Sequence, residues 1–173
     1  MHVKLGRVQV DNRKKRYFTY ALQWIRDCLA RVIPDSSDLE YKHSTIPEWD
    51  FVAQLAKRSG CFILLDINNI YVNSVNHGFD PIRFIDVIPA DLVGEMHLAG
   101  FSRKEGLPVP LLIDSHDHPV YPEVWDLYQY AVSQIGLKPT LIEWDAHIPA
   151  FSVLQDEAHK AEQVMYETHA ITC

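Results

Sequence analysis

The sequence lacks the features that mark membrane proteins, nucleic-acid-binding proteins and disulfide-stabilised proteins. No apolar run approaches the ~20 residues of a transmembrane helix, and the first 16 residues lack the apolar segment of a signal peptide. The net charge of −7 disfavours nucleic acid as a partner, because phosphate requires clustered positive charge. Three widely spaced cysteines without a C-x-x-C pair indicate a reducing compartment. We therefore expect a cytoplasmic protein with no membrane or nucleic-acid partner.

The chain is rich in alternating strand and helix patterns, which predict an α/β fold. Strands are predicted at residues 61–67, 93–100, 111–113 and 140–142. Helices are predicted at residues 17–33, 46–58, 80–88, 122–135 and 152–168, and loops at 71–78 and 101–110. A capping box at Thr45 and a stop at Gly60 bound the second helix. Such alternation is typical of a parallel sheet built from right-handed crossovers.

Each predicted strand ends at or near a residue whose side chain can bind a metal ion, either a carboxylate or an imidazole. The apolar run Cys61–Leu65 stops at Asp66, and a carboxylate at the end of a buried strand needs a cation, a metal or a ligand. Asp114 and His116 are two residues apart, so an extended segment presents both on one face. Parallel strands share one rim at their carboxyl ends. The predicted metal ligands on this rim are Asp66, Asn69, His97, Asp114, His116 and Glu143.

This ligand set indicates which metal the site would hold. Carboxylates and imidazoles without thiolates suit iron, manganese or zinc, and three or more carboxylates favour an iron or manganese cluster. Further polar residues near the strand ends could support the ligands without binding metal themselves. These are Asn68, Asn76, His77 and Asp145.

Five motifs in order carry a family resemblance: LLDINNIYVNSVNHGFDP, EMHLAGF, LLIDSHDHPV, VWDLYQYAV and PTLIEWDAHIP. Over about residues 36–170 the chain resembles the carboxy-terminal two-thirds of the multinuclear non-haem iron-dependent oxidative enzymes, which include the methanobactin-modifying enzyme. The resemblance implies a triosephosphate-isomerase-type barrel of the xylose-isomerase-like group, with two or three iron ions. It implies oxidation of cysteine or other side chains in a ribosomally made precursor peptide, often presented by a partner protein. It also makes the six predicted ligands iron ligands.

The chain departs from this family at its beginning. Two further histidines and an E-N-x-S segment, typical of the family's first strands, are not found, and residues 1–35 carry none of its motifs. We therefore expect an atypical segment with a helix at 1–35, and the carboxy-terminal part of a (β/α)8 barrel at 36–173 with about four parallel strands and flanking helices. A truncated form of this kind would bind fewer irons, could be inactive, and could self-associate through uncovered strand edges.

Two other functions fit the same residues. A divalent-metal sugar isomerase or hydrolase of xylose-isomerase-like fold uses similar carboxylates and histidines at its strand ends. A non-catalytic half-barrel, or a partner-binding module, would keep the fold without a complete site. Visible colour separates iron from magnesium or zinc, and metal content separates an enzyme from a remnant.

Overall fold

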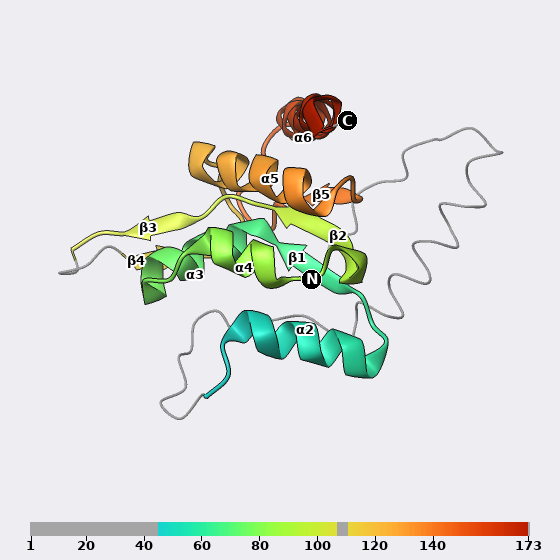
Figure 1. Ribbon diagram of the computed structural model, residues 1–173. Helices are drawn as coiled ribbons and strands as arrows, with labels where there is room; N and C mark the ends of the chain where they lie inside the picture. Colours follow the sequence, from blue (N-terminus) through green and yellow to red (C-terminus); the bar gives the residue numbers. More distant parts are fainter. Residues whose placement is uncertain (1–44, 107–110, 173) are drawn as a thin grey trace.

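Three short parallel strands form the centre of the fold (Figure 1). The computed structural model describes residues 45–106 and 111–172. β1 (Ile63–Asp66) pairs with β2 (Val93–Leu98), which in turn pairs with β5 (Thr140–Ile142). In this register Asp66 lies opposite His97. The carboxyl ends of the strands therefore meet at one edge of the sheet, as predicted from the alternating pattern.

Helices cover both faces of this sheet. In Figure 1, α5 and α6 lie on one side and α2 on the other. The helices are α2 (Glu48–Ser59), α3 (Ile67–His77), α4 (Pro81–Val87), the short 3-10 helix η1 (Ala90–Leu92), α5 (Pro122–Ile135) and α6 (Phe151–Thr172). The core joins strand and helix residues, and its fully buried large side chains include Leu65, Met96, Leu98, Phe101 and Tyr128. The described residues thus form a mixed α/β fold, and no helix among them is long and apolar enough to cross a membrane.

Local chemistry sets the helix ends, mostly as predicted. Gly60 ends α2 in the left-handed conformation with φ of 70°, which glycine adopts without a steric penalty. The Asp80 carboxylate caps α4 by accepting a hydrogen bond from the Ile82 backbone N–H at 2.9 Å. The predicted capping box at Thr45 is wrong. Pro47 takes the N-cap position of α2, so Thr45 lies outside the reach of the first turn.

The segment predicted as a loop at 71–78 is instead the second half of helix α3. The helix begins directly after Asp66, whose carboxylate accepts a hydrogen bond from the Asn69 backbone N–H at 2.9 Å. Its buried face carries Asn68 and Asn73 beside the apolar residues. Buried amides interrupt the apolar stripe that identifies a helix from sequence, which explains the wrong prediction.

Four parallel strands were expected, but the parallel sheet of the described residues has three. The other predicted strand, β4 (Leu111–Ile113), does not join this sheet. It forms an antiparallel pair with β3 (Ser102–Lys104), a strand inside the predicted loop 101–110. On its other side, the Asn76 side chain donates to the Leu112 carbonyl at 2.9 Å and accepts from the Leu112 N–H at 3.0 Å. This amide therefore satisfies both backbone polar groups of Leu112. The predicted helix 17–33 and the boundary at residue 35 lie outside the described residues.

Candidate metal centre

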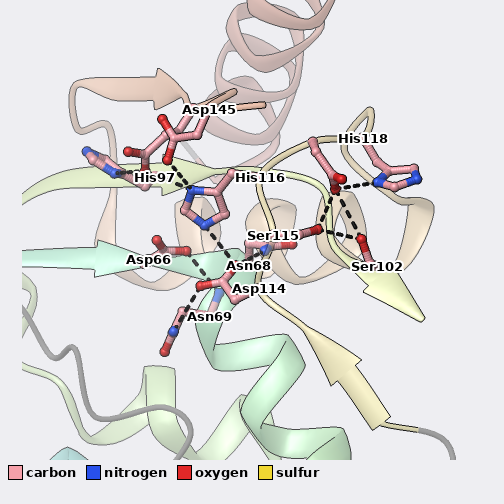
Figure 2. Close-up of polar contacts among 12 residues, drawn as sticks. Asp66, Asn68, Asn69, His97, Ser102, Asp114, Ser115, His116, His118 and Asp145 are labelled. Carbon is pink, nitrogen blue, oxygen red and sulfur yellow. Dashed lines mark hydrogen bonds and ion pairs between the residues drawn. The ribbon is translucent and has the colours of Figure 1, made fainter. Parts of the chain in front are cut away.

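Asp66 lies where the sheet meets helix α3, at the middle of the site (Figure 2). It is the last residue of β1 and the cap of α3, so both its backbone and its carboxylate have fixed positions. Burial, followed by the negative charge of Asp114, raises the pKa of Asp66 to about 6. The raised pKa means that the surroundings of Asp66 offer too little positive charge to offset its burial. A bound metal ion would supply that charge.

His97 on β2 lies between two carboxylates. Its Nδ1 atom is 3.1 Å from Glu143 Oε2, and its Nε2 atom is 3.7 Å from Glu95 Oε1. The Glu143 backbone N–H donates to the Leu98 carbonyl at 2.8 Å, which continues the β5 pairing and holds Glu143 beside His97. Burial alone would lower the pKa of His97, but the contacts with Glu143 and Glu95 outweigh it and raise this pKa to about 9. The hydrogen bond from His97 lowers the pKa of Glu143.

A close approach of two backbone segments positions His116. The His116 N–H donates to the Gly100 carbonyl at 3.0 Å, and the His116 carbonyl accepts from the Asp145 N–H at 2.7 Å. A Cβ atom on Gly100 would lie 2.2 Å from the His118 carbonyl oxygen, so this contact requires glycine. His116 itself has a left-handed φ of 49°, which is uncommon for a residue with a side chain. The loop after β4 is thus fastened to the end of β2.

The His116 imidazole faces carboxylates on both sides (Figure 2). Its Nε2 atom lies 2.8 Å from Asp114 Oδ1, and its Nδ1 atom lies 3.4 Å from Glu143 Oε2 and 3.5 Å from Asp145 Oδ2. The Nε2 atom is buried, and its short contact with Asp114 is an ion pair when the imidazole is protonated. Burial opposes the charged imidazole, but Asp114 outweighs it and raises the pKa of His116 to about 9. A nitrogen and an oxygen at this spacing can share one ion.

Two side-chain amides of α3 donate hydrogen bonds to the Asp114 carboxylate. The Asn68 side chain donates to Asp114 Oδ1, and the Asn69 side chain donates to Asp114 Oδ2 at 3.1 Å. The Asn69 amide oxygen accepts a hydrogen bond from the Asn73 side chain at 2.9 Å, so its nitrogen faces Asp114. Although burial disfavours the charge on Asp114, His116 and the two amides outweigh it and lower its pKa. Asp114 is therefore an anion with both oxygens oriented.

The donor atoms converge into three overlapping groups, and within each group they lie within 4.8 Å of one another. The groups are Asp66–His97–Glu143, Asp66–Asp114–His116 and His116–Glu143–Asp145. Asp66, His116 and Glu143 each belong to two groups, so the three groups form one connected set. The buried Nε2 atom of His116 and the thiolate-free donor set fit a hard or borderline divalent cation.

The structure brings together most, but not all, of the predicted site residues. Asp145, predicted to support the ligands, contributes a donor atom to the third group. Asn69 and Asn68 contact Asp114, whereas Asn76 binds the β4 backbone. His77 lies in the last turn of α3 and in none of the three groups.

Sequence reasoning missed three residues beside the site: Glu95, Asn73 and Asp117. Glu95 had a usable signal, because it precedes His97 by two residues in a strand and so shares its face. Asn73 follows Asn69 by four residues, which places both on one face of a helix once α3 is recognised. Asp117 lies in the D-S-H-D-H run, but its contacts come from three separate segments.

Comparison with known proteins shows which family the chain matches. Residues 16–166 match the model of the RiPP precursor modification enzyme family MbnB/TglH/ChrH, whose substrates are ribosomally made peptides. Similar proteins include a UPF0276 protein of Acaryochloris marina, 48% identical over 124 residues, which are 72% of this chain and 44% of the relative. A UPF0276 protein of Vibrio vulnificus is 46% identical over 144 residues, 82% of this chain and 50% of the relative.

A UPF0276 protein of Vibrio parahaemolyticus is 46% identical over 151 residues, covering 86% of this chain and 52% of that protein. The chain thus spans about half the length of the curated relatives that it matches. The family match covers most of the chain, including every residue of the three donor groups. The chain therefore belongs to the MbnB/TglH/ChrH family of RiPP precursor modification enzymes.

Proposed function

We propose that this chain binds iron at the carboxyl ends of β1, β2 and β5 and takes part in oxidative modification of a ribosomally made precursor peptide. Family membership supports the peptide substrate, and the donor groups support the metal. We also propose that the parallel sheet and its helices are part of a triosephosphate-isomerase-type barrel. Sites in such barrels lie at the carboxyl ends of the strands, which is where the donor groups lie.

The observation that carries the proposal is the overlap of the three donor groups, which are joined to one another through Asp66, His116 and Glu143. The His116 Nε2 atom lies 2.8 Å from Asp114, and its Nδ1 atom faces Glu143 and Asp145. Asp66 and Asp114 contribute donor atoms to the same group, so two carboxylates lie close together there. A metal ion held by these residues would take the place of the imidazolium proton and would offset the repulsion between the two aspartates.

The residues around the ligands would fix the geometry of the metal. Asn68 and Asn69 orient the Asp114 carboxylate, and Glu95 holds the side of His97 that faces away from Glu143. Bound iron would supply dioxygen-dependent redox chemistry and Lewis acidity toward a substrate thiolate, with cysteine as the first substrate side chain to test. The Asp145 side chain is 67% exposed, so this side of the site is open to a peptide.

Protons would leave the site when a metal enters. With pKa values of about 9, both His97 and His116 are protonated at neutral pH in the metal-free protein. Metal binding requires neutral imidazoles, so a metal ion must displace these protons. The carboxylates that hold the imidazolium ions would then become ligands, or hold the imidazoles by hydrogen bonds to the nitrogen that does not bind metal.

Metal reconstitution tests this proposal directly. Chelator-treated protein would be loaded anaerobically with Fe(II), desalted and analysed for iron, with optical spectra before and after exposure to air. We expect bound iron and visible absorption after oxidation, and loss of both in His97→Ala and His116→Ala. His159→Ala, on the exposed face of α6, is the matched control. Retention of iron by both site variants would refute the assignment, as would failure of the unmodified protein to bind any.

Peptide chemistry is tested separately with the iron-loaded protein, dioxygen, a precursor peptide and its presenting partner protein. We expect a mass change on the peptide that requires both iron and dioxygen. A metal-loaded protein that stays colourless in air and leaves the peptide unchanged would favour the isomerase or hydrolase alternative. Iron binding without any mass change would indicate a chain that keeps the site but not the whole activity.

A further inference from the structure

Beside the donor groups lies a second polar cluster, centred on Asp117. Figure 2 shows three of its members, Ser102, Ser115 and His118. One oxygen, Oδ1, accepts hydrogen bonds from the Ser115 and Ser102 hydroxyls, the latter at 3.2 Å, and lies 2.6 Å from His118 Nδ1. The other oxygen, Oδ2, lies 3.3 Å from His147 Nδ1. The two serine hydroxyls are also 2.7 Å apart. Four side chains therefore meet at a single carboxylate.

These partners come from three different segments of the rim. Ser102 begins β3 directly after β2, Ser115 and His118 lie in the loop after β4, and His147 lies in the loop after β5. Each of these segments lies within a few residues of a donor-group residue. Asp117 follows His116 directly, and His147 comes two residues after Asp145. The cluster therefore joins the loops that carry the donors, although it is not one of the donor groups itself.

The backbone of these loops adopts an unfavourable conformation at two residues, which surrounding contacts must stabilise. His116 and His147, with φ of 49° and 51°, are the non-glycine residues with positive φ in the described part of the chain. Side chains disfavour this conformation, and it persists where surrounding contacts over-determine it. Asp117 is bonded to one of these histidines through its side chain and to the other through the peptide bond. Its carboxylate thus connects the two strained positions.

Other functions for the cluster fit the contacts less well. A nucleophilic serine needs a hydrogen bond to an imidazole, but Ser102 and Ser115 donate to the carboxylate instead. A separate metal site would need free carboxylate oxygens, and those of Asp117 already receive four contacts. The contacts therefore favour a role in positioning.

We propose that Asp117 is a positioning residue for the metal centre, joining the loops after β2, β4 and β5 so that His116 and Asp145 stay in register with Asp66. The inference rests on the proposed metal site. It goes beyond the proposed site because Asp117 would fix the positions of the metal ligands without touching the metal. Removing the carboxylate should loosen the 114–118 and 144–147 segments while the sheet and α5 stay unchanged.

Cobalt binding gives one test, because the visible spectrum of Co(II) reports the number and arrangement of its ligands. Chelator-treated Asp117→Ala should bind Co(II) about 10–100-fold more weakly than the unmodified chain, the usual effect of removing a residue that supports a ligand. Its spectrum should also change shape at saturation. Asp117→Asn keeps an acceptor for the serines and should lose less. Glu105→Gln, an exposed carboxylate near the end of β3, should match the unmodified chain.

Hydrogen–deuterium exchange of the metal-free proteins gives a second test that does not depend on metal. In Asp117→Ala, amides of residues 114–118 and 144–147 should exchange faster, including the Asp145 N–H that donates to His116, and those of α5 should not. Unchanged exchange in these segments would overturn the inference. An unchanged Co(II) affinity and spectrum in Asp117→Ala would overturn it as well. If the unmodified chain bound no Co(II), the proposed function would fail, and the exchange result would still decide the role of Asp117 in the loops.

Discussion

Replacing Asp66 by asparagine should stabilise the metal-free protein and abolish its affinity for metal. Asparagine keeps the shape of the side chain and caps a helix as well as aspartate does, so α3 should begin unchanged. It removes a charge that the fold disfavours, because burial and Asp114 raise the pKa of Asp66 from 3.8 to about 6. Each pH unit of this difference corresponds to about 1.4 kcal/mol, so the charge costs about 3 kcal/mol at neutral pH.

The pH dependence of stability follows from the direction of this shift. Because the pKa of Asp66 is higher in the folded than in the unfolded state, its protonated form stabilises the fold. This contribution is fully present below pH 3.8 and is lost as the pH rises through about 6. Urea denaturation of the chelator-treated proteins should therefore give similar free energies of unfolding near pH 4. At pH 7.5 the variant should be more stable by about 3 kcal/mol.

Two comparisons make this test decisive. Asp80→Asn is the same chemical change at the exposed cap of α4, and it should alter stability by less than about 0.5 kcal/mol. Saturating metal should stabilise the unmodified protein by about 2.7 kcal/mol at 100 times the Kd, and it should leave Asp66→Asn unchanged. Equal stability of the two metal-free proteins at pH 7.5 would refute the buried-charge reasoning. Equal stabilisation by metal would refute Asp66 as a ligand.

Three further predictions concern the segments around the site. Gly100→Ala places a methyl group against the His118 backbone, and should destabilise the protein by about 1–3 kcal/mol in urea denaturation and weaken metal binding. Metal affinity should rise from pH 6.5 to pH 9 as the protons of His97 and His116 are lost, with proton release measurable by calorimetry in buffers of different ionisation enthalpy. Asn76→Ala leaves two β4 backbone groups without their partner and should cost about 1–3 kcal/mol, whereas an unchanged urea midpoint would contradict this role.

The rule that polar residues end parallel strands identified most of the candidate site from sequence. The structure brings Asp66, His97 and Glu143 together because parallel pairing aligns the carboxyl ends of β1, β2 and β5. Asp114 and His116 also joined the site, although β4 lies outside the parallel sheet. Their position depends instead on contacts with Gly100 and with the amides of α3.

Contacts between distant residues explain what the sequence could not predict. Helix α3 was hidden because three of its asparagines, Asn68, Asn69 and Asn76, have partners that are distant in the sequence, and no local pattern shows that such amides will be satisfied. β3 consists of Ser-Arg-Lys, which carries no signal of a strand. Asp117 resembles an ordinary loop aspartate until the three segments that it joins are folded together.

The double position of Asp66, as the end of one element and the start of the next, limits how this protein can vary. With no spacer between β1 and α3, one inserted or deleted residue would turn the carboxylate to the opposite face of the sheet or remove the cap of the helix. An insertion or deletion at this junction should therefore separate Asp66 from the other donor residues or unfold the first turn of α3.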